Sequence, residues 1–136
     1  MAHFALSNIL WIQEQRVRAR FHLEQAYSLG NNFVVIVNNL AWILANDENP
    51  DLERALELAR TAVDRAPDNP RFRDTLGTVL MKQSQYEKAI SEFQRAINGI
   101  PNRSKVHSKL AFCYLALGMT DLAELHRAKS IIEIPK

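Results

Sequence analysis

The chain has 136 residues, of which 47% are hydrophobic and 24% are charged, so one folded domain with a sizeable core is expected. Its net charge of +2 offers little attraction to a nucleic-acid backbone. No apolar run reaches the roughly 18 residues that a membrane span requires. The first residues also lack the basic region and the cleavage site of a signal peptide.

A single cysteine, Cys113, cannot form an internal disulfide and is compatible with a reducing compartment. It lies in the apolar stretch "LAFCYLALG", so we expect a buried thiol and no nucleophile. We expect a cytoplasmic protein, or a periplasmic one if the chain is a segment of an exported protein.

An internal period of 34 residues organises the chain. The prolines 67, 101 and 135 are spaced by this number, and sliding the sequence by 34 also places Leu76 on Leu110 and Ala89 on Ala123. Four units result, each predicted to be a pair of helices: 1–33, 34–69, 70–103 and 104–136.

The first two units share their apolar positions. Leu6 and Leu10 align with Leu40 and Leu44 at a spacing of 34, which predicts equivalent first helices. Two alanines of each second helix align at a spacing of 36, because "NDENPD" adds two residues between the helices of the second unit; these pairs are Ala19 with Ala55 and Ala26 with Ala62.

The third unit has the clearest helix boundaries. Asn69 before Pro70 predicts an N-cap followed by a first-turn proline. Ser84 and Glu87 have the spacing of a capping box at the start of the second helix, and "NGIP" predicts its end. Small residues recur at 77, 89 and 96, where they would let the two helices approach closely.

These residues resemble the tetratricopeptide repeat, a helical hairpin of 34 residues. The positions that carry the resemblance in the third unit are Leu76, Gly77, Leu80, Ala89, Phe93, Ala96 and Pro101. The first unit departs at Asn31, where the family has proline, and the fourth departs at Arg127 and Ser130. The resemblance implies an all-α fold: a right-handed solenoid of four helix-turn-helix units, with about eight antiparallel helices.

The resemblance also implies a function, because the first helices of such repeats line a concave groove that binds extended or helical peptides. Helical geometry places the fifth, ninth and twelfth positions of each unit opposite its packing face, with the second and sixth positions beside them. The candidate groove residues on this stripe are Asn8, Trp11, Asn38, Asn39, Trp42, Arg71, Asp74, Thr78, Lys105, Lys109 and Phe112.

The chemistry of this stripe suits a peptide with acidic character. Asparagine side chains both donate and accept hydrogen bonds, so they can pair with a peptide backbone of any sequence. Trp11, Trp42 and Phe112 offer flat apolar anchors, and the cations can hold a carboxylate. The alternative for both tryptophans is packing between neighbouring first helices.

Enzymatic activity is not expected. The chain has no phosphate loop, no His-Glu-x-x-His, no Cys-x-x-Cys and no Gly-x-Ser-x-Gly motif. Its four histidines lie in four different predicted helices without ligand spacing, so neither a metal nor another cofactor is expected.

Two further functions fit a helical repeat. The first is self-assembly, because the final helix is followed only by "PK", so the chain is either a segment of a larger repeat protein or has an open end that another copy covers. Phrases such as "NNLAWILA" resemble bacterial tetratricopeptide proteins, including components of envelope and exopolysaccharide assembly. The second is binding of single-stranded RNA, against which the near-neutral charge argues.

Overall fold

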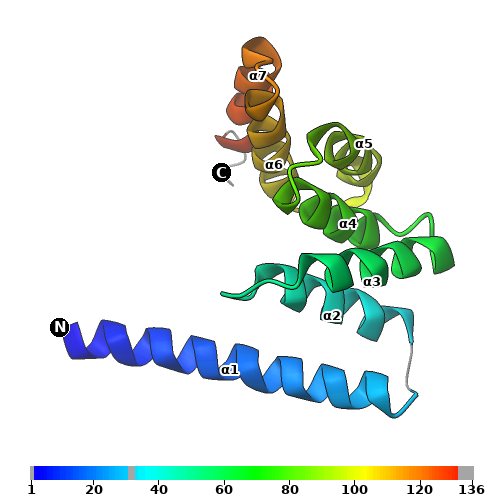
Figure 1. Cartoon of the computed structure of the whole chain (residues 1–136). Coiled ribbons are helices and arrows are strands. Elements are labelled where there is room, and N and C mark those ends of the chain that lie inside the picture. Colours follow the sequence, from blue (N-terminus) through cyan, green and yellow to red (C-terminus); the bar gives the residue numbers. More distant parts are fainter. Residues whose placement is uncertain (1, 31–32, 132–136) are drawn as a thin grey trace.

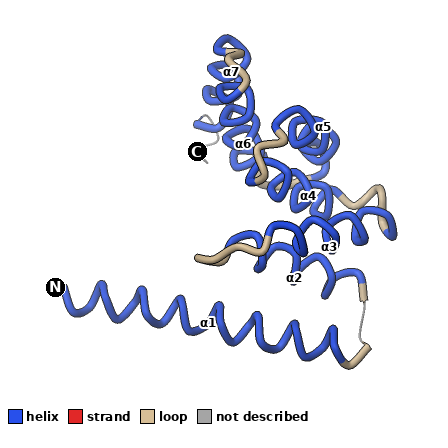
Figure 2. Tube along the Cα trace, in the orientation of Figure 1, coloured by secondary structure: helices blue, strands red, loops and turns tan. Residues whose placement is uncertain are grey.

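The computed structural model describes residues 2–30 and 33–131, with side chains from residue 12 onward. Within these ranges the chain forms seven α-helices and one short 3-10 helix, and it has no strand (Figures 1 and 2). The all-α prediction is therefore confirmed. The helices are α1 (Ala2–Ser28), α2 (Val34–Asn46), α3 (Leu52–Arg65), α4 (Pro70–Lys82), α5 (Tyr86–Ala96), η1 (Ile97–Gly99), α6 (Arg103–Ala116) and α7 (Thr120–Ile131).

Three helical hairpins build the body of the molecule. Helices α2 and α3, α4 and α5, and α6 and α7 pack in pairs, while α3 lies against α4 and α5 lies against α6. Figure 1 shows these pairs following one another as a solenoid from α2 to α7. The first helices also meet, because α4 contacts both α2 and α6.

The helix starts of the third unit test the predicted caps. The Asn69 side chain accepts a hydrogen bond of 3.0 Å from the Arg71 amide, and Pro70 occupies the first turn, so the predicted cap is confirmed. The predicted capping box at Ser84 is wrong, since Gln85 is the N-cap of α5 and makes no side-chain cap bond. Ser84 instead has a φ of +62°, because the chain reverses direction at this residue.

Small residues bring the paired helices together as predicted. Ala89 and Phe93 of α5 are completely buried. A Cβ atom on Gly77 of α4 would lie only 2.6 Å from the Phe93 ring, so this crossing requires glycine opposite the ring. Leucines from each hairpin complete the core, among them Leu40, Leu44 and Leu110.

The first unit differs from its prediction. Residues 2–28 form one continuous helix and not a hairpin, so the described chain has seven α-helices where about eight were expected (Figure 2). The physical reason lies at residues 13–16, "QEQR", where all the side chains favour helix and no glycine or proline ends it. An ion pair between Glu14 and Arg18, 2.9 Å long, further supports the helix across this stretch.

Candidate functional site

The predicted groove residues of α2 divide between the surface and the core. Asn39 is exposed, and Trp42 is exposed to 44%. Asn38 is only 8% exposed, and its Oδ1 atom has no hydrogen-bond partner among the described residues. Asn38 therefore does not offer its amide to a ligand on the surface, because the rotation of α2 places this position against the body.

Three predicted residues between α4 and α6 form an internal network. The Lys109 ammonium donates to the Asp74 carboxylate at 3.1 Å and to the Thr78 hydroxyl at 3.0 Å. The buried Thr78 hydroxyl donates in turn to the Asp74 backbone carbonyl at 2.9 Å. These groups bind one another across two units, so the expected role of Lys109 as a cation ready for a ligand is corrected.

The remaining candidates of α4 and α6 lie at the surface. Arg71 and Lys105 are exposed in the first turns of their helices. Phe112 is exposed to 55%, and its ring centroid lies 6.2 Å from that of Tyr86. The side chains of Asn8 and Trp11 lie outside the described residues. Their backbone belongs to α1, so in this structure the row of first helices consists of α2, α4 and α6.

A second surface feature was not predicted from the sequence. A pocket of about 750 Å³ lies between α1 and α2, with Ile12, Val17, Phe21, Trp42 and Ile43 as its apolar residues. The signal that could have revealed it is the apolar spacing of residues 17 and 21 on α1, combined with the absence of a turn-forming residue before them. The other lining residues are Gln13, Arg16, Arg20, Glu24, Asn46, Asp47 and Glu48.

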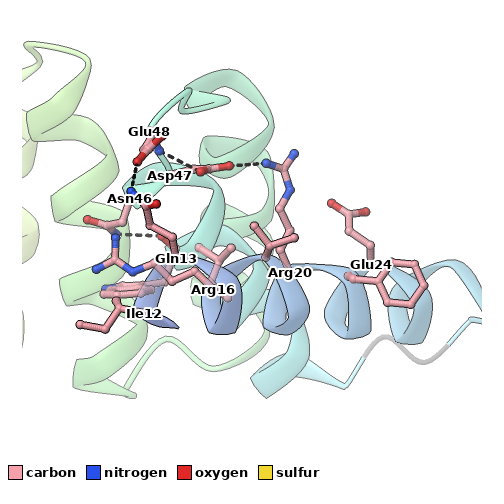
Figure 3. A pocket seen from close by; sticks show the side chains of 12 residues that line it. Ile12, Gln13, Arg16, Arg20, Glu24, Asn46, Asp47 and Glu48 are labelled. Carbon is pink, nitrogen blue, oxygen red and sulfur yellow. Dashed lines mark hydrogen bonds and ion pairs between the residues drawn. The ribbon is translucent and has the colours of Figure 1, made fainter. Parts of the chain in front are cut away.

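Polar contacts lie along the rim of this α1–α2 pocket. Arg20 of α1 forms an ion pair with Asp47, and the Gln13 amide donates to Glu48 at 2.6 Å (Figure 3). Glu24 accepts two hydrogen bonds from Arg54 of α3, of 2.5 and 2.9 Å. The hydrogen bonds that Arg54 donates to Glu24 raise the pKa of Arg54. These charged groups tie the second half of α1 to the body.

The fourth unit contains a histidine pair. The Nδ1 atoms of His107 and His126 lie 3.0 Å apart, and the Tyr114 ring stacks on His126 at a centroid distance of 5.4 Å. Burial, followed by the nearby His107 and Lys129, lowers the pKa of His126. This pair is partly buried between α6 and α7, so it acts as a packing element of the hairpin.

The predicted buried cysteine is confirmed. Cys113 is completely buried, and burial raises the pKa of its thiol to about 11, so little thiolate forms near neutral pH. Within the described residues, no group of three or more His, Cys, Asp or Glu side chains is placed to hold a metal ion. No helix in the same part of the chain is long and apolar enough to cross a membrane.

Known proteins resemble this chain in sequence and in fold. Residues 48–107 match the family model described as Tetratricopeptide repeat. The TPR repeat-containing thioredoxin TTL4 of Arabidopsis thaliana is 32% identical over 72 residues, which is 53% of this chain and 11% of that protein. The chain therefore spans only about a ninth of this relative's length.

Solved structures of MamA share the fold over most of the chain. MamA AMB-1 superposes with a TM-score of 0.71 at 26% identity, covering 83% of this chain and 66% of that one. MamA from Desulfovibrio magneticus RS-1 superposes with a TM-score of 0.74 at 23% identity, covering 94% of this chain and 69% of that one. The superposed part of the present chain thus spans about two thirds of the length of these MamA chains.

Proposed function

Because this chain is a tetratricopeptide-repeat protein, we propose that it is a non-catalytic interaction module that binds a peptide or helical segment along α2, α4 and α6. The repeat fold supports an interaction role in general. The position of the binding surface is inferred from the side chains that the repeat packing leaves exposed.

Two exposed aromatic rings carry the proposal. Trp42 and Phe112 lie on first helices, at a repeat position that the packing between helices does not need, and both remain about half exposed. Large aromatic side chains concentrate binding energy when a partner covers them. The helices that bear them are joined through α4, which contacts both, so one extended partner can reach both rings.

The charges on this surface favour an acidic partner. Arg71 and Lys105 are exposed, whereas the Asp74 carboxylate is already neutralised by Lys109. The surface therefore presents two cations without a competing free carboxylate from Asp74. Asn39 beside Trp42 adds an amide that can pair with a peptide backbone. We expect affinities on the order of micromolar for a short segment.

A displayed peptide library tests this proposal. Peptides selected on the wild-type protein should be enriched in acidic and apolar residues, and their affinity can be measured by fluorescence anisotropy. The double change Asn39→Ala with Trp42→Ala, and separately Lys105→Glu, should each raise Kd by roughly tenfold or more, because each removes an anchor or a cation.

Two surface changes elsewhere serve as controls. Lys88→Ala on α5 and Leu125→Ala on α7 alter exposed residues away from the first helices and should leave Kd unchanged. Circular dichroism should show equal helical content for all variants. Binding that survives both the double change and Lys105→Glu would place the peptide site elsewhere.

A further inference from the structure

Helix α1 has the length of two repeat helices. It contains 27 residues, whereas α2 contains 13 and α3 contains 14. Its residues Leu6 and Leu10 precede by 34 the fully buried Leu40 and Leu44 of α2. The first half of α1 therefore has the sequence of a packed first helix, and the second half has the aligned alanines of a second helix.

A single turn position explains why the two halves stay joined. The turn of the third unit reads "QSQ" and the corresponding residues of the first unit read "QEQ". The middle residue is in the left-handed region in the turns of the third and fourth units, with φ +62° at Ser84 and +76° at Gly118. The first unit has Glu14 there, which favours helix and pairs with Arg18.

The α1–α2 pocket lies where the missing helix of the first unit would pack. In the third unit the first helix, α4, contacts both its own second helix, α5, and the next first helix, α6. In the first unit, a packed first helix would have two corresponding neighbours: the second half of α1 and the helix α2. The pocket lies between these two. Figure 1 shows the first half of α1 continuing straight past α2 instead.

The straight segment and the pocket have matching chemistry. Residues 2–12, "AHFALSNILWI", contain no Asp, Glu, Lys or Arg, which is unusual for a helix that projects from the body into water. The pocket presents exposed Val17, Phe21 and Trp42 to the space between the helices. Covering both surfaces at once would remove a large apolar area from water.

We propose that two copies of this chain exchange the first halves of α1, so that residues 2–12 of each copy fill the α1–α2 pocket of the other. Exchange leaves both helices straight, whereas filling the pocket of the same copy would break α1 at Glu14. The two α1 helices then run antiparallel about a two-fold axis, and each first unit is completed by the second copy. Exchange covers Trp42, which is also part of the proposed peptide surface, but it leaves Arg71, Lys105 and Phe112 of that surface uncovered.

Neighbouring repeats supply the geometry for a direct test. In the third unit, a Cβ on Gly77 would contact the Phe93 ring, and the corresponding positions of the first unit are Ser7 and Leu23. Exchange therefore brings Ser7 of one copy next to Leu23 of the other. Within one straight helix these positions are about 24 Å apart, since each residue advances the helix by about 1.5 Å.

The test uses one chain with Ser7→Cys, Leu23→Cys and Cys113→Ser, oxidised and separated on a non-reducing gel. Exchange predicts covalent dimers, because a disulfide needs Cβ atoms about 4 Å apart and only two copies provide that. A monomer with an internal bridge would show that α1 folds back on itself, and an unreacted monomer would show an unfilled pocket; either overturns the proposal. A control chain with Ser7→Cys and Arg60→Cys, which lies on the exposed side of α3, should remain monomeric, and equal crosslinking there would also count against exchange.

Glu14 provides an independent measurement on the otherwise unmodified chain. Light scattering should give the wild type twice the chain mass of 15.6 kDa. Glu14→Gly should give the single-chain mass, because glycine permits the turn found at Gly118. Glu14→Ala removes the same side chain but keeps the helix, so it should remain a dimer.

Three results would contradict the exchange. They are a monomeric wild type at all concentrations, a Glu14→Gly variant that stays dimeric, and a dimer abolished by Leu125→Gln, since that change would place the contact on α7. Peptide binding that remains sensitive to Lys105→Glu in the Glu14→Gly monomer separates this proposal from the proposed function, because Lys105 and Phe112 lie outside the α1–α2 pocket.

Discussion

At the residue scale, the size of the residue at each repeat position depends on the residue that it packs against. Gly77 faces the buried Phe93, whereas the aligned positions in the second unit are Ala41 and the much smaller Ala59, both of which are buried. A methyl group is therefore accepted where the opposing residue is small and is excluded where the opposing residue is a ring. The consensus of the repeat sets the type of residue, and the partner sets its size.

Gly77→Ala should destabilise the protein even though alanine favours helix. The added Cβ would lie 2.6 Å from the Phe93 ring, which is completely buried, so we expect a loss of about 1–3 kcal/mol in the free energy of unfolding. Urea denaturation measures this change. Adding Phe93→Leu should make Gly77→Ala less costly than it is in the wild type, and equal costs in both backgrounds would show that the ring is not the cause.

Polar residues of the candidate site show the limit of sequence reasoning at this scale. The stripe rule correctly selected Asn39, Trp42 and Phe112 as exposed residues. It could not show that Lys109 pairs with Asp74, because the partner lies 35 residues away in another unit. It also could not show the burial of Asn38, since one position of rotation decides whether a side chain beside the packing face meets solvent.

At the element scale, the first unit is one long helix where the third unit is a hairpin. The turns "QSQ" and "QEQ" differ only in the middle, yet the first ends α4 and the second lies inside α1. The fourth unit forms the predicted pair of helices, and its turn contains Gly118 at a positive φ. The first unit was predicted as a hairpin because the spacing of apolar residues indicates which helix faces are packed. It does not show whether the chain turns between two such stretches.

The α6–α7 hairpin should lose stability in acid. Burial, followed by the nearby His107 and Lys129, lowers the pKa of His126 below its usual 6.5. The cation Arg103 also lines the pocket beside His107 and His126. Below pH 6.5, His126 therefore binds a proton more readily in the unfolded chain than in the folded hairpin. The free energy of unfolding then falls as the pH falls. Urea midpoints at pH 7.5 and 5.5 measure this difference.

Substitution of the histidine isolates its contribution. His126→Gln should reduce the change in urea midpoint between pH 7.5 and 5.5, because a neutral amide takes up no proton. His22→Gln, an exposed histidine of α1, is the matched control and should leave the pH dependence as in the wild type. An unaltered dependence in His126→Gln would assign the acid sensitivity to other groups.

At the scale of the whole molecule, each hairpin is stabilised mainly by its contacts with the neighbouring hairpins. The central helices α3, α4 and α5 have packed neighbours on both sides, whereas α1 lies at one end and packs on α2. In repeat proteins each unit is stabilised mainly by its neighbours, so opening should begin at the ends. The charged contacts of Glu24 and Arg20 hold only the second half of α1 to the body.

Hydrogen exchange should follow this order along the chain. Amides of α4 and α5 should exchange slowest, and those of residues 2–12 should exchange fastest in dilute protein, because this segment lies beyond the packed body (Figure 1). If copies exchange helices, protection of residues 2–12 should rise with protein concentration, while that of α4 and α5 stays constant. Mass spectrometry of peptic fragments at two concentrations measures both quantities.

The sequence by itself determined the helical repeat and its packed faces. A period of 34 residues, small residues at 77 and 89, and the cap at Asn69 act between groups close in the chain or repeated in each unit, so they can be read without coordinates. Only the tertiary structure decided which polar groups meet across units and that the first unit is a single helix beside an open pocket. These features depend on contacts between distant residues and on whether a turn forms in the first unit, and both are decided by the packing of the whole molecule.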